Sequence, residues 1–314
     1  MNHIQWATEA LHDLGYPLKT PIPEIVLETA WSKVYRFHTD LGWVYLKKVP
    51  QALALEPQVI KLLATQFKAH VPQVLAENTE HHCFLMQDAG IPLHDVFKQG
   101  FNADILIQTL QHYTDLQMQS ADNIELFLTL GVPDWRLCQL PTLYRQLLNE
   151  KELLLNDGLT SEEITQLQTL DKKLVAICEQ LAQYNIPDTF GHADFHDKNI
   201  LINPKTSQTT LIDLGEVVIT HPFFSFHNCL FRTTEYLKLT KEQYNQLQAS
   251  CFKKWLGLES SQHIVDIIDL INRCWAIHAV LGEYRLIKSV ESFASLQLSR
   301  QGRFAAKLRA WIEQ

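Results

Sequence analysis

Two short stretches in the second half of the chain combine carboxylates with an amide at close spacing. Residues 192–199 have the sequence HADFHDKN, and residues 212–216 have the sequence IDLGE. Asn199 follows Asp194 by five residues, and Asp213 follows Asn199 by 14. Phosphoryl transfer needs a carboxylate that orients the attacking hydroxyl and oxygen ligands that hold Mg²⁺ against the phosphates. Because Mg²⁺ prefers carboxylate and amide oxygens, the pattern indicates a magnesium-dependent phosphoryl-transfer site.

The same stretch allows a second interpretation, a transition-metal site. His192, Asp194 and His196 alternate along the chain, and His221 and His227 could complete a ligand set. Such a site would belong to a metallohydrolase. This hypothesis leaves the amide of the first stretch and the aspartate of the second without a role.

A β-hairpin is expected to bring the two stretches together. Residues 199–202 and 210–212 are short apolar runs, and the loop 203–208 between them is polar. This hairpin would deliver the amide and both carboxylates to one cleft. Gly215 is expected to let the chain turn away just after the metal ligand.

The first 90 residues differ in character from the rest of the chain. After a helix over about 4–14, they predict the order β-β-β-α-β-β, with elements at 25–27, 34–37, 43–49, 55–67, 73–76 and 83–87. Beyond residue 90 the pattern is mostly helical, with segments at 103–119, two or three helices within 140–184, and helices from about 241 to the C-terminus. We therefore expect two parts, 1–88 and 89–314.

The stretch 192–216 resembles the catalytic core of the aminoglycoside phosphotransferase and choline kinase family, which has a protein-kinase-like fold. The family pattern is His-Gly-Asp-x-His-x-x-Asn and then Ile-Asp-x-Gly, with Ala193 here in place of the first glycine. The resemblance implies that Asp194 is the catalytic base and that Asn199 and Asp213 bind Mg²⁺. It also implies a two-lobed α+β fold, with a small β-rich N-terminal nucleotide-binding lobe and a larger, mainly helical C-terminal lobe that binds the acceptor.

The N-terminal segment resembles the same family. Val44-Tyr45-Leu46-Lys47 is similar to the strand whose lysine reaches the ATP phosphates, although Lys48 lies beside it. Glu56 is similar to the ion-pair partner of that lysine. Because Pro57 follows it, a solvated carboxylate at a helix N-terminus explains Glu56 as well.

Residues 84–88 resemble the last strand and hinge of the lobe, so the backbone around Met86 and Asp88 would meet the adenine. The loop 28–33 departs from the family because it contains no glycine, and Ser32 is the expected substitute donor to phosphate. A catalytically weak or dead nucleotide-binding protein is therefore an alternative to an active kinase. His221 also departs from the family, which often has an acidic residue before this proline.

Composition narrows the classes of partner. The 314 residues carry a formal net charge of -8 and no basic block, which disfavours a nucleic-acid partner. The six cysteines form no CxxC pair that could bind zinc, and such scattered single cysteines are typical of buried thiols in a reducing compartment. No signal peptide or membrane-spanning stretch is visible, so we expect a soluble cytoplasmic protein with no membrane partner. The overall expectation is an ATP- and Mg²⁺-dependent kinase that phosphorylates a hydroxyl of an aminoglycoside, choline-like or sugar-like molecule.

Overall fold

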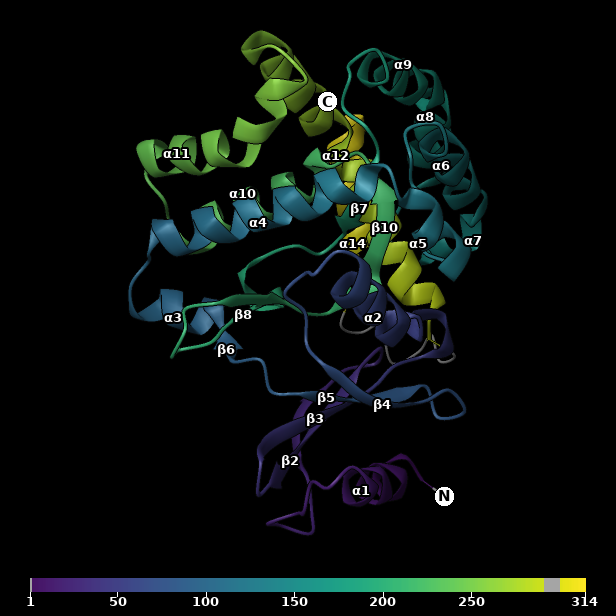
Figure 1. The fold of residues 1–314 in the computed structure, drawn as a ribbon. Coiled ribbons are helices and arrows are strands. Elements are labelled where there is room, and N and C mark those ends of the chain that lie inside the picture. Colours follow the sequence, from purple (N-terminus) through teal and green to yellow (C-terminus); the bar gives the residue numbers. More distant parts are fainter. Residues whose placement is uncertain (1, 291–299) are drawn as a thin grey trace. The chain divides into compact units, whose positions relative to one another are not determined.

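The computed structural model describes residues 2–290 and 300–314, and it divides into two compact units (Figure 1). The first unit consists mainly of the chain up to Leu93 and of Asn199–Gly215. The second consists mainly of His94–Lys198, Glu216–Lys288 and the C-terminal helix. The hairpin expected around residues 199–212 therefore belongs to the same unit as the N-terminal sheet.

An antiparallel five-stranded sheet forms the centre of the first unit, in the order β1-β2-β3-β5-β4. Its strands are β1 (Glu24–Glu28), β2 (Lys33–Thr39), β3 (Gly42–Lys48), β4 (Val74–Asn78) and β5 (Cys83–Gln87). Side chains alternate between the two sides of β3, and the buried Val44 and Leu46 face the same side of the sheet. Helix α1 (His3–Asp13) packs there through Ala7 and Leu11. The opposite side of β3 therefore carries Trp43, Tyr45 and Lys47.

Helix α2 (Glu56–Gln66) follows a short 3-10 turn, η1 (Gln51–Leu53). Pro57 occupies the first turn of the helix, where the missing backbone N–H costs no hydrogen bond. The buried side of the helix consists of Glu56, Val59, Ile60 and Leu63. The helix thus buries a carboxylate together with its apolar residues.

A second, three-stranded sheet in the first unit has the order β6-β8-β9. It contains β6 (Ile91–Pro92), β8 (Ile200–Ile202) and β9 (Thr209–Leu211). A Cβ atom on Gly90 would lie 2.3 Å from the carbonyl oxygen of Ile202, and the φ of Gly90 is +125°. Only glycine therefore allows the chain to pass this close to the hairpin.

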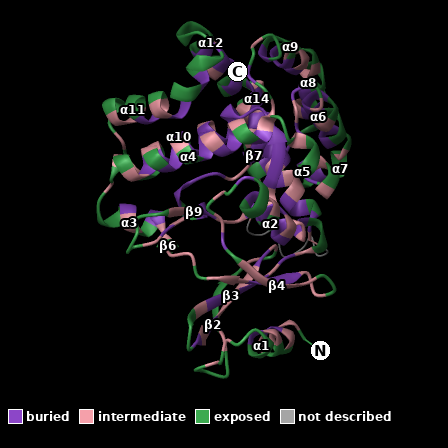
Figure 2. Cartoon of the chain, in the orientation of Figure 1, coloured by how far each residue is buried: buried purple, intermediate pink, exposed green. Residues whose placement is uncertain are grey.

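The second unit is mostly helical. Its helices are α3 (Leu93–Gln99), α4 (Ala103–Ala121), α5 (Ile124–Leu130), α6 (Leu140–Asn149), α7 (Lys151–Asn156), α8 (Ser161–Thr169), α9 (Asp171–Leu181), α10 (Phe223–Leu237), α11 (Lys241–Phe252), α12 (Ser261–Lys288) and α14 (Arg303–Ile312). The 3-10 turn η4 (Lys253–Gly257) follows α11, and two further 3-10 turns, η2 (Asp197–Asn199) and η3 (Leu214–Glu216), flank the hairpin where the chain passes between the units. A two-stranded ribbon pairs β7 (Thr189–His192) with β10 (Val217–Thr220). Every residue of both strands is buried (Figure 2).

The expected α+β fold, with a β-rich N-terminal region and a helical C-terminal region, is confirmed. The β-β-β-α-β-β order and the hairpin are both present. The region 140–184 holds four helices, where two or three were expected. The expected helical run from about residue 241 includes 291–299, which lie outside the described residues. Strands β7 and β10 were not predicted, because fully buried strands lack the alternation that marks a strand in sequence.

Candidate active site

A lysine is paired with two carboxylates in the first unit. The Nζ atom of Lys47 lies 2.8 Å from Oε1 and 2.7 Å from Oε2 of Glu56. The same Nζ lies 2.6 Å from Oδ1 of Asp213. The side chains of Lys47 and Glu56 are only 7% and 2% exposed. We call these three side chains the Lys47 cluster.

Lys47 occupies this position, and Lys48 does not, because neighbouring strand residues face opposite sides of the sheet. Lys48 faces the side of the sheet that α1 covers. Burial and the positive charge of Lys48 lower the pKa of His3, which is in α1. Burial alone would lower the pKa of Lys47, but the carboxylates of Asp213 and Glu56 outweigh it and raise that pKa. Lys47 is therefore a fixed positive charge at neutral pH.

The hairpin places Asn199 and Asp213 at one end. Ile200 pairs with Leu211 across β8 and β9, and the N–H of Ile212 donates to the carbonyl oxygen of Asn199 at 3.0 Å. Asp213, the next residue, has a left-handed φ of +61°. This conformation costs a non-glycine residue about 1 kcal/mol, and aspartate tolerates it better than most. Such strain is often found at functional sites.

The backbone after Asp213 also contacts Glu56. The N–H of Leu214 donates to Oε1 of Glu56 at 3.1 Å. A Cβ atom on Gly215 would lie 3.4 Å from Oε2 of the same carboxylate. The expected role of Gly215 is therefore corrected: Asp213, and not Gly215, has the left-handed φ at this turn, and a Cβ atom at residue 215 would make only an ordinary contact with Glu56.

The glycine-free loop between β1 and β2 contains a buried hydroxyl. Ser32 is 8% exposed, and its Oγ has no hydrogen-bond partner in the described structure. The loop is closed by Thr29, whose backbone N–H and hydroxyl both donate to the carbonyl oxygen of Ser32, at 2.8 and 3.1 Å. An ion pair between Lys33 and Glu28 spans its two ends. The loop is thus held by its own polar contacts, and Ser32 retains a donor.

Met86 and Asp88 lie at the end of β5. Met86 pairs with Tyr45 of β3. The backbone N–H of Asp88 donates to the carbonyl oxygen of Trp43 at 3.3 Å, and its side chain accepts from the N–H of Gly90 at 3.1 Å. The N–H of Asp88 is therefore used within the protein, and adenine recognition by this segment remains a prediction.

In the second unit, the loop after β7 is fixed by aromatic and amide contacts. The ring of Phe195 stacks on Tyr113 of α4, with centroids 4.1 Å apart. Asn228 of α10 donates from Nδ2 to the carbonyl oxygen of Phe195 at 3.2 Å. The N–H of His192 is 2.8 Å from the hydroxyl of Tyr113 and 3.2 Å from that of Ser225. Two helices thus hold the backbone on both sides of Asp194.

The carboxylate of Asp194 has a basic partner at each oxygen. Nε2 of His196 lies 3.1 Å from Oδ2, and a guanidinium nitrogen of Arg232 on α10 lies 3.4 Å from Oδ1. Burial alone would raise the pKa of Asp194. The hydrogen bond with His196 and the charge of Arg232 instead hold that pKa well below its usual range. Asp194 is therefore ionised at neutral pH. Arg232 is a contact that the sequence motif did not reveal.

The metallohydrolase hypothesis is not supported by this geometry. Among the described residues, no group of three His, Cys, Asp or Glu side chains is arranged to hold a metal ion. His192, Asp194 and His196 are all described. Nδ1 of His192 instead accepts the N–H of Asp194 at 3.2 Å. That nitrogen is used to shape the loop.

His221, which replaces an acidic residue common in the family, also has a structural role. It is fully buried, and its Nδ1 accepts the N–H of Phe223 at the start of α10 at 3.3 Å. Burial lowers the pKa of His221 to about 3, so the ring is neutral and this nitrogen can accept. A neutral imidazole thus supplies the acceptor that a carboxylate would supply at this helix start.

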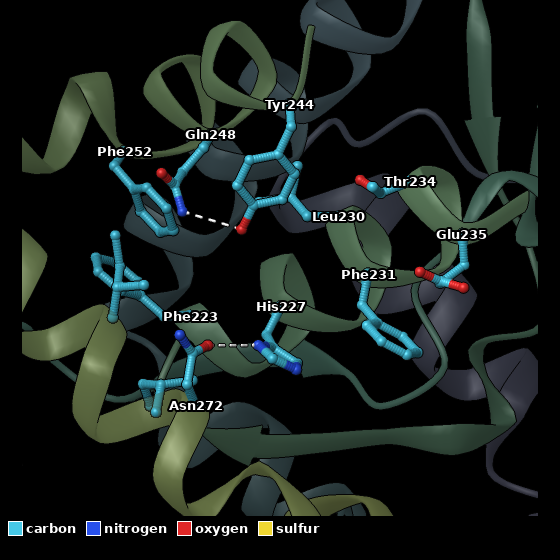
Figure 3. Close-up of a pocket in the computed structure, with 12 residues that line it drawn as sticks. Phe223, His227, Leu230, Phe231, Thr234, Glu235, Tyr244, Gln248, Phe252 and Asn272 are labelled. Atoms are coloured by element: carbon cyan, nitrogen blue, oxygen red, sulfur yellow. Dashed lines mark hydrogen bonds between the residues drawn. The ribbon is translucent and has the colours of Figure 1, made fainter. Parts of the chain in front are cut away.

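A pocket of about 190 Å³ lies between α10, α11 and α12 (Figure 3). Half of its twelve lining residues are aliphatic side chains or phenylalanines: Phe223, Leu230, Phe231, Phe252, Ile268 and Ile271. Two polar pairs face each other across it, His227 with Asn272 at 2.8 Å and Tyr244 with Gln248 at 3.2 Å. Thr234 and Glu235 complete the lining. An apolar cavity with a few placed polar groups is typical of a small-molecule site.

The pocket and the loop of Asp194 share helix α10. Phe231 and Glu235 line the pocket, whereas Asn228 and Arg232 contact the loop. Successive helix residues are separated by 100°, so the Arg232 side of the helix adjoins the Phe231 side. Helix α12 also carries two buried polar residues, His278 and Glu283, which do not line this pocket.

Comparisons with known proteins agree with this architecture. The family described as "Phosphotransferase enzyme family" (APH) matches residues 26–252, and the chain belongs to this family. It is therefore a phosphotransferase of the small-molecule kinase class, as the sequence motif indicated. A search of the curated proteins finds no match. No described helix is long and apolar enough to cross a membrane.

Solved structures share the fold at low sequence identity. An ethanolamine kinase from Plasmodium vivax aligns with a TM-score of 0.60 and 13% identity, covering 91% of this chain and 84% of its own. The aminoglycoside phosphotransferase APH(3'')-Id from Streptomyces rimosus, in complex with ADP and streptomycin, gives 0.58 and 18%, covering 90% and 99%. A choline kinase from Streptococcus pneumoniae gives 0.59 and 12%, covering 98% of each chain.

Proposed function

We propose that this protein transfers the γ-phosphoryl group of ATP to a hydroxyl of a small molecule, with Mg²⁺ as cofactor. The observation that carries the proposal is the Lys47 cluster. A buried lysine, fixed between Glu56 and Asp213, is a charge suited to phosphate oxygens. The nucleotide-bound forms of relatives, such as the ADP complex of APH(3'')-Id, support a nucleotide cofactor. In this proposal residues 1–88 form the nucleotide-binding lobe, and 89–314 the catalytic and acceptor-binding lobe.

Asn199 and Asp213 are the proposed magnesium ligands. The hairpin register brings the two residues to one end, and their amide and carboxylate oxygens are the donors that Mg²⁺ prefers. When bound, the ion would neutralise charge that develops on the phosphates. The left-handed φ of Asp213 supports a functional constraint at this position.

Ser32 is the proposed phosphate donor of the glycine-free loop, because its buried hydroxyl has no partner within the described structure. The segment around Met86 and Asp88 is proposed to meet the adenine through its remaining backbone groups. Glu56 holds Lys47 in place and is not expected to touch the nucleotide.

Asp194 is the proposed base that orients the acceptor hydroxyl and takes its proton. Its depressed pKa suits orientation of the hydroxyl, with proton transfer late in a loose transition state. The pocket between α10, α11 and α12 is the proposed site for the body of the acceptor, because α10 also carries Arg232 and Asn228 to the loop of Asp194. Aminoglycosides, choline-like and sugar-like molecules are the candidate acceptors. We place the enzyme in the cytoplasm, since its six cysteines are all free.

The first test is the thermal midpoint with nucleotide. A ligand that binds only the folded protein, at about 100 times its dissociation constant, adds roughly 2.7 kcal/mol of stability. Mg²⁺·ATP should therefore raise the midpoint by several degrees, and zinc should not. Asp213→Asn tolerates the same φ but removes the charge, so it should lose most of the magnesium dependence of ATP binding. A wild-type response to Mg²⁺ in this variant would place the metal elsewhere.

An active enzyme and a nucleotide-binding protein without activity are distinguished by turnover. ATP consumption should be measured with kanamycin, choline, ethanolamine and simple sugars, and with water alone. An active kinase consumes ATP faster with at least one acceptor, and Asp194→Asn removes that increment while nucleotide binding persists. Binding without any stimulated turnover across a wide set of hydroxyl compounds would favour the inactive alternative.

A further inference from the structure

A chain of buried polar side chains runs behind Asp194 in the second unit. Nε2 of His196 contacts Oδ2 of Asp194 at 3.1 Å. On its other side, the ring of His196 lies 3.7 Å from a carboxylate oxygen of Asp197. Nδ1 of His94, on α3, contacts the second oxygen of Asp197 at 2.8 Å. The side chains of His196, Asp197 and His94 are 6%, 7% and 8% exposed.

The hydrogen bonds define how His196 is oriented. Its Nδ1 accepts the backbone N–H of Lys198 at 3.1 Å, so in the neutral ring the proton is on Nε2. In the protonated ring Nε2 also carries a proton. His196 is therefore a donor to Oδ2 of Asp194 in both states, and the contact does not depend on the charge of the ring.

The two oxygens of Asp194 thus lie in different surroundings. Oδ2 meets the buried His196, whereas Oδ1 faces Arg232, whose side chain is 49% exposed. A carboxylate can rotate about its Cβ–Cγ bond, and only a fixed partner determines which oxygen faces the substrate. His196 is such a partner, because its own ring is held by the Lys198 amide and by burial.

We propose that His196 is a positioning residue for the transfer reaction: it fixes Oδ2 of Asp194, so that the Oδ1 edge meets the acceptor hydroxyl. Asp197 lies behind the ring and is itself paired with His94. This inference rests on the proposed function, in which Asp194 is the base. It assigns a role in kinase chemistry to the second histidine of the motif, for which the family resemblance alone implied none.

Other charged groups also surround the Asp194–His196 pair. His192 on β7, Arg232 on α10, and Asp197 and His94 behind the ring all contribute to the local field. A test must therefore change the His196 contact alone. His196→Gln keeps an N–H donor of similar reach, and His196→Leu removes it. His278→Leu is the matched control, because His278 is a buried histidine of the same unit outside this chain of contacts.

A direct readout is the pKa of Asp194, followed by ¹³C NMR of carboxyl-labelled protein and assigned with Asp194→Asn. Loss of the donor in His196→Leu should raise this pKa by about one unit or more. His196→Gln should recover much of the difference, and His278→Leu should leave the pKa unchanged. This measurement needs neither acceptor nor nucleotide.

The kinetic readout is ATP turnover, with the best acceptor of the panel above and with water alone. A positioned base contributes a factor of about 10²–10⁴, so His196→Leu should lower kcat roughly 10- to 100-fold. KM for Mg²⁺·ATP should change less than about twofold, and His196→Gln should regain most of kcat. If Asp194→Asn abolishes turnover while His196→Leu keeps wild-type kcat and Asp194 pKa, the positioning role is wrong and the proposed function stands. If Asp194→Asn retains full turnover, the proposed function itself fails.

Discussion

Removal of Lys47 should destabilise the protein through the carboxylate that it leaves behind. Glu56 is 2% exposed, and its partners include Lys47 at 2.7–2.8 Å and the N–H of Leu214 at 3.1 Å. In Lys47→Met the carboxylate of Glu56 stays buried without its cation. Breaking a buried ion pair by removing one partner costs about 3–5 kcal/mol. For a chain of this size we expect a fall in the calorimetric midpoint of roughly 5–10 °C.

The double variant Lys47→Met/Glu56→Gln distinguishes two causes of destabilisation, the loss of the ion pair and the burial of an unpaired carboxylate. Replacing both members with neutral side chains of similar volume is often nearly neutral, so the double variant should recover most of the lost midpoint. Both variants should lose ATP binding, since each lacks the phosphate-facing ammonium. Calorimetric scans at pH 7.5, without nucleotide, measure the stabilities. Equal destabilisation of the single and double variants would refute the reasoning, because the orphaned carboxylate would then contribute nothing.

Two further predictions concern the second unit. Burial raises the pKa of Asp188 to about 6, although Arg136 opposes it, and Oδ1 of Asp188 has no partner in the described structure. The folded protein therefore binds the proton more tightly than the unfolded chain, and stability falls as pH rises from about 4 to above 6. Asp188→Asn should be more stable than wild type by about 1–3 kcal/mol at pH 7.5 in urea unfolding, with no advantage below about pH 4. Separately, Phe231→Ala removes an aromatic side chain from the proposed acceptor pocket, so it should raise KM for the acceptor at least several-fold while KM for Mg²⁺·ATP stays the same. Steady-state kinetics with both substrates varied measure the two constants. A change in KM for Mg²⁺·ATP instead of KM for the acceptor would contradict this assignment of the pocket.

The residues proposed for phosphoryl transfer could be singled out in the sequence because that chemistry restricts their type and spacing. The strand around Lys47 was predictable because a run of aromatic and aliphatic residues follows a turn, and the structure shows that Lys47, not Lys48, pairs with Glu56 because the two lysines face opposite sides of the sheet. The ion pair of Glu56 was left open in sequence, since Pro57 also fits a solvated helix start. In the structure Glu56 is buried and paired with Lys47, so it is not a solvated carboxylate. Its burial results from tertiary packing, which local sequence does not reveal.

Other features could not be predicted from local sequence. Strands β7 and β10 are buried on all sides and carry no alternation, so only their pairing reveals them. Arg232 lies 38 residues beyond Asp194, and only the packing of α10 brings the two together. The pocket likewise combines side chains from three helices. Such long-range contacts have no signature in the spacing of a single segment.

The most direct test of the account follows the γ-phosphate itself. ATP labelled with ¹⁸O in the γ-phosphoryl group is incubated with the protein, Mg²⁺ and the small-molecule fraction of a cell extract, and the products are analysed by mass spectrometry. Asp194→Asn and a magnesium-free reaction serve as controls. We expect wild type to form a phosphomonoester that retains the transferred ¹⁸O, with yields at least about 100-fold lower in both controls. A labelled product formed equally by Asp194→Asn, or ATP converted only to ADP and inorganic phosphate by wild type, would contradict the account.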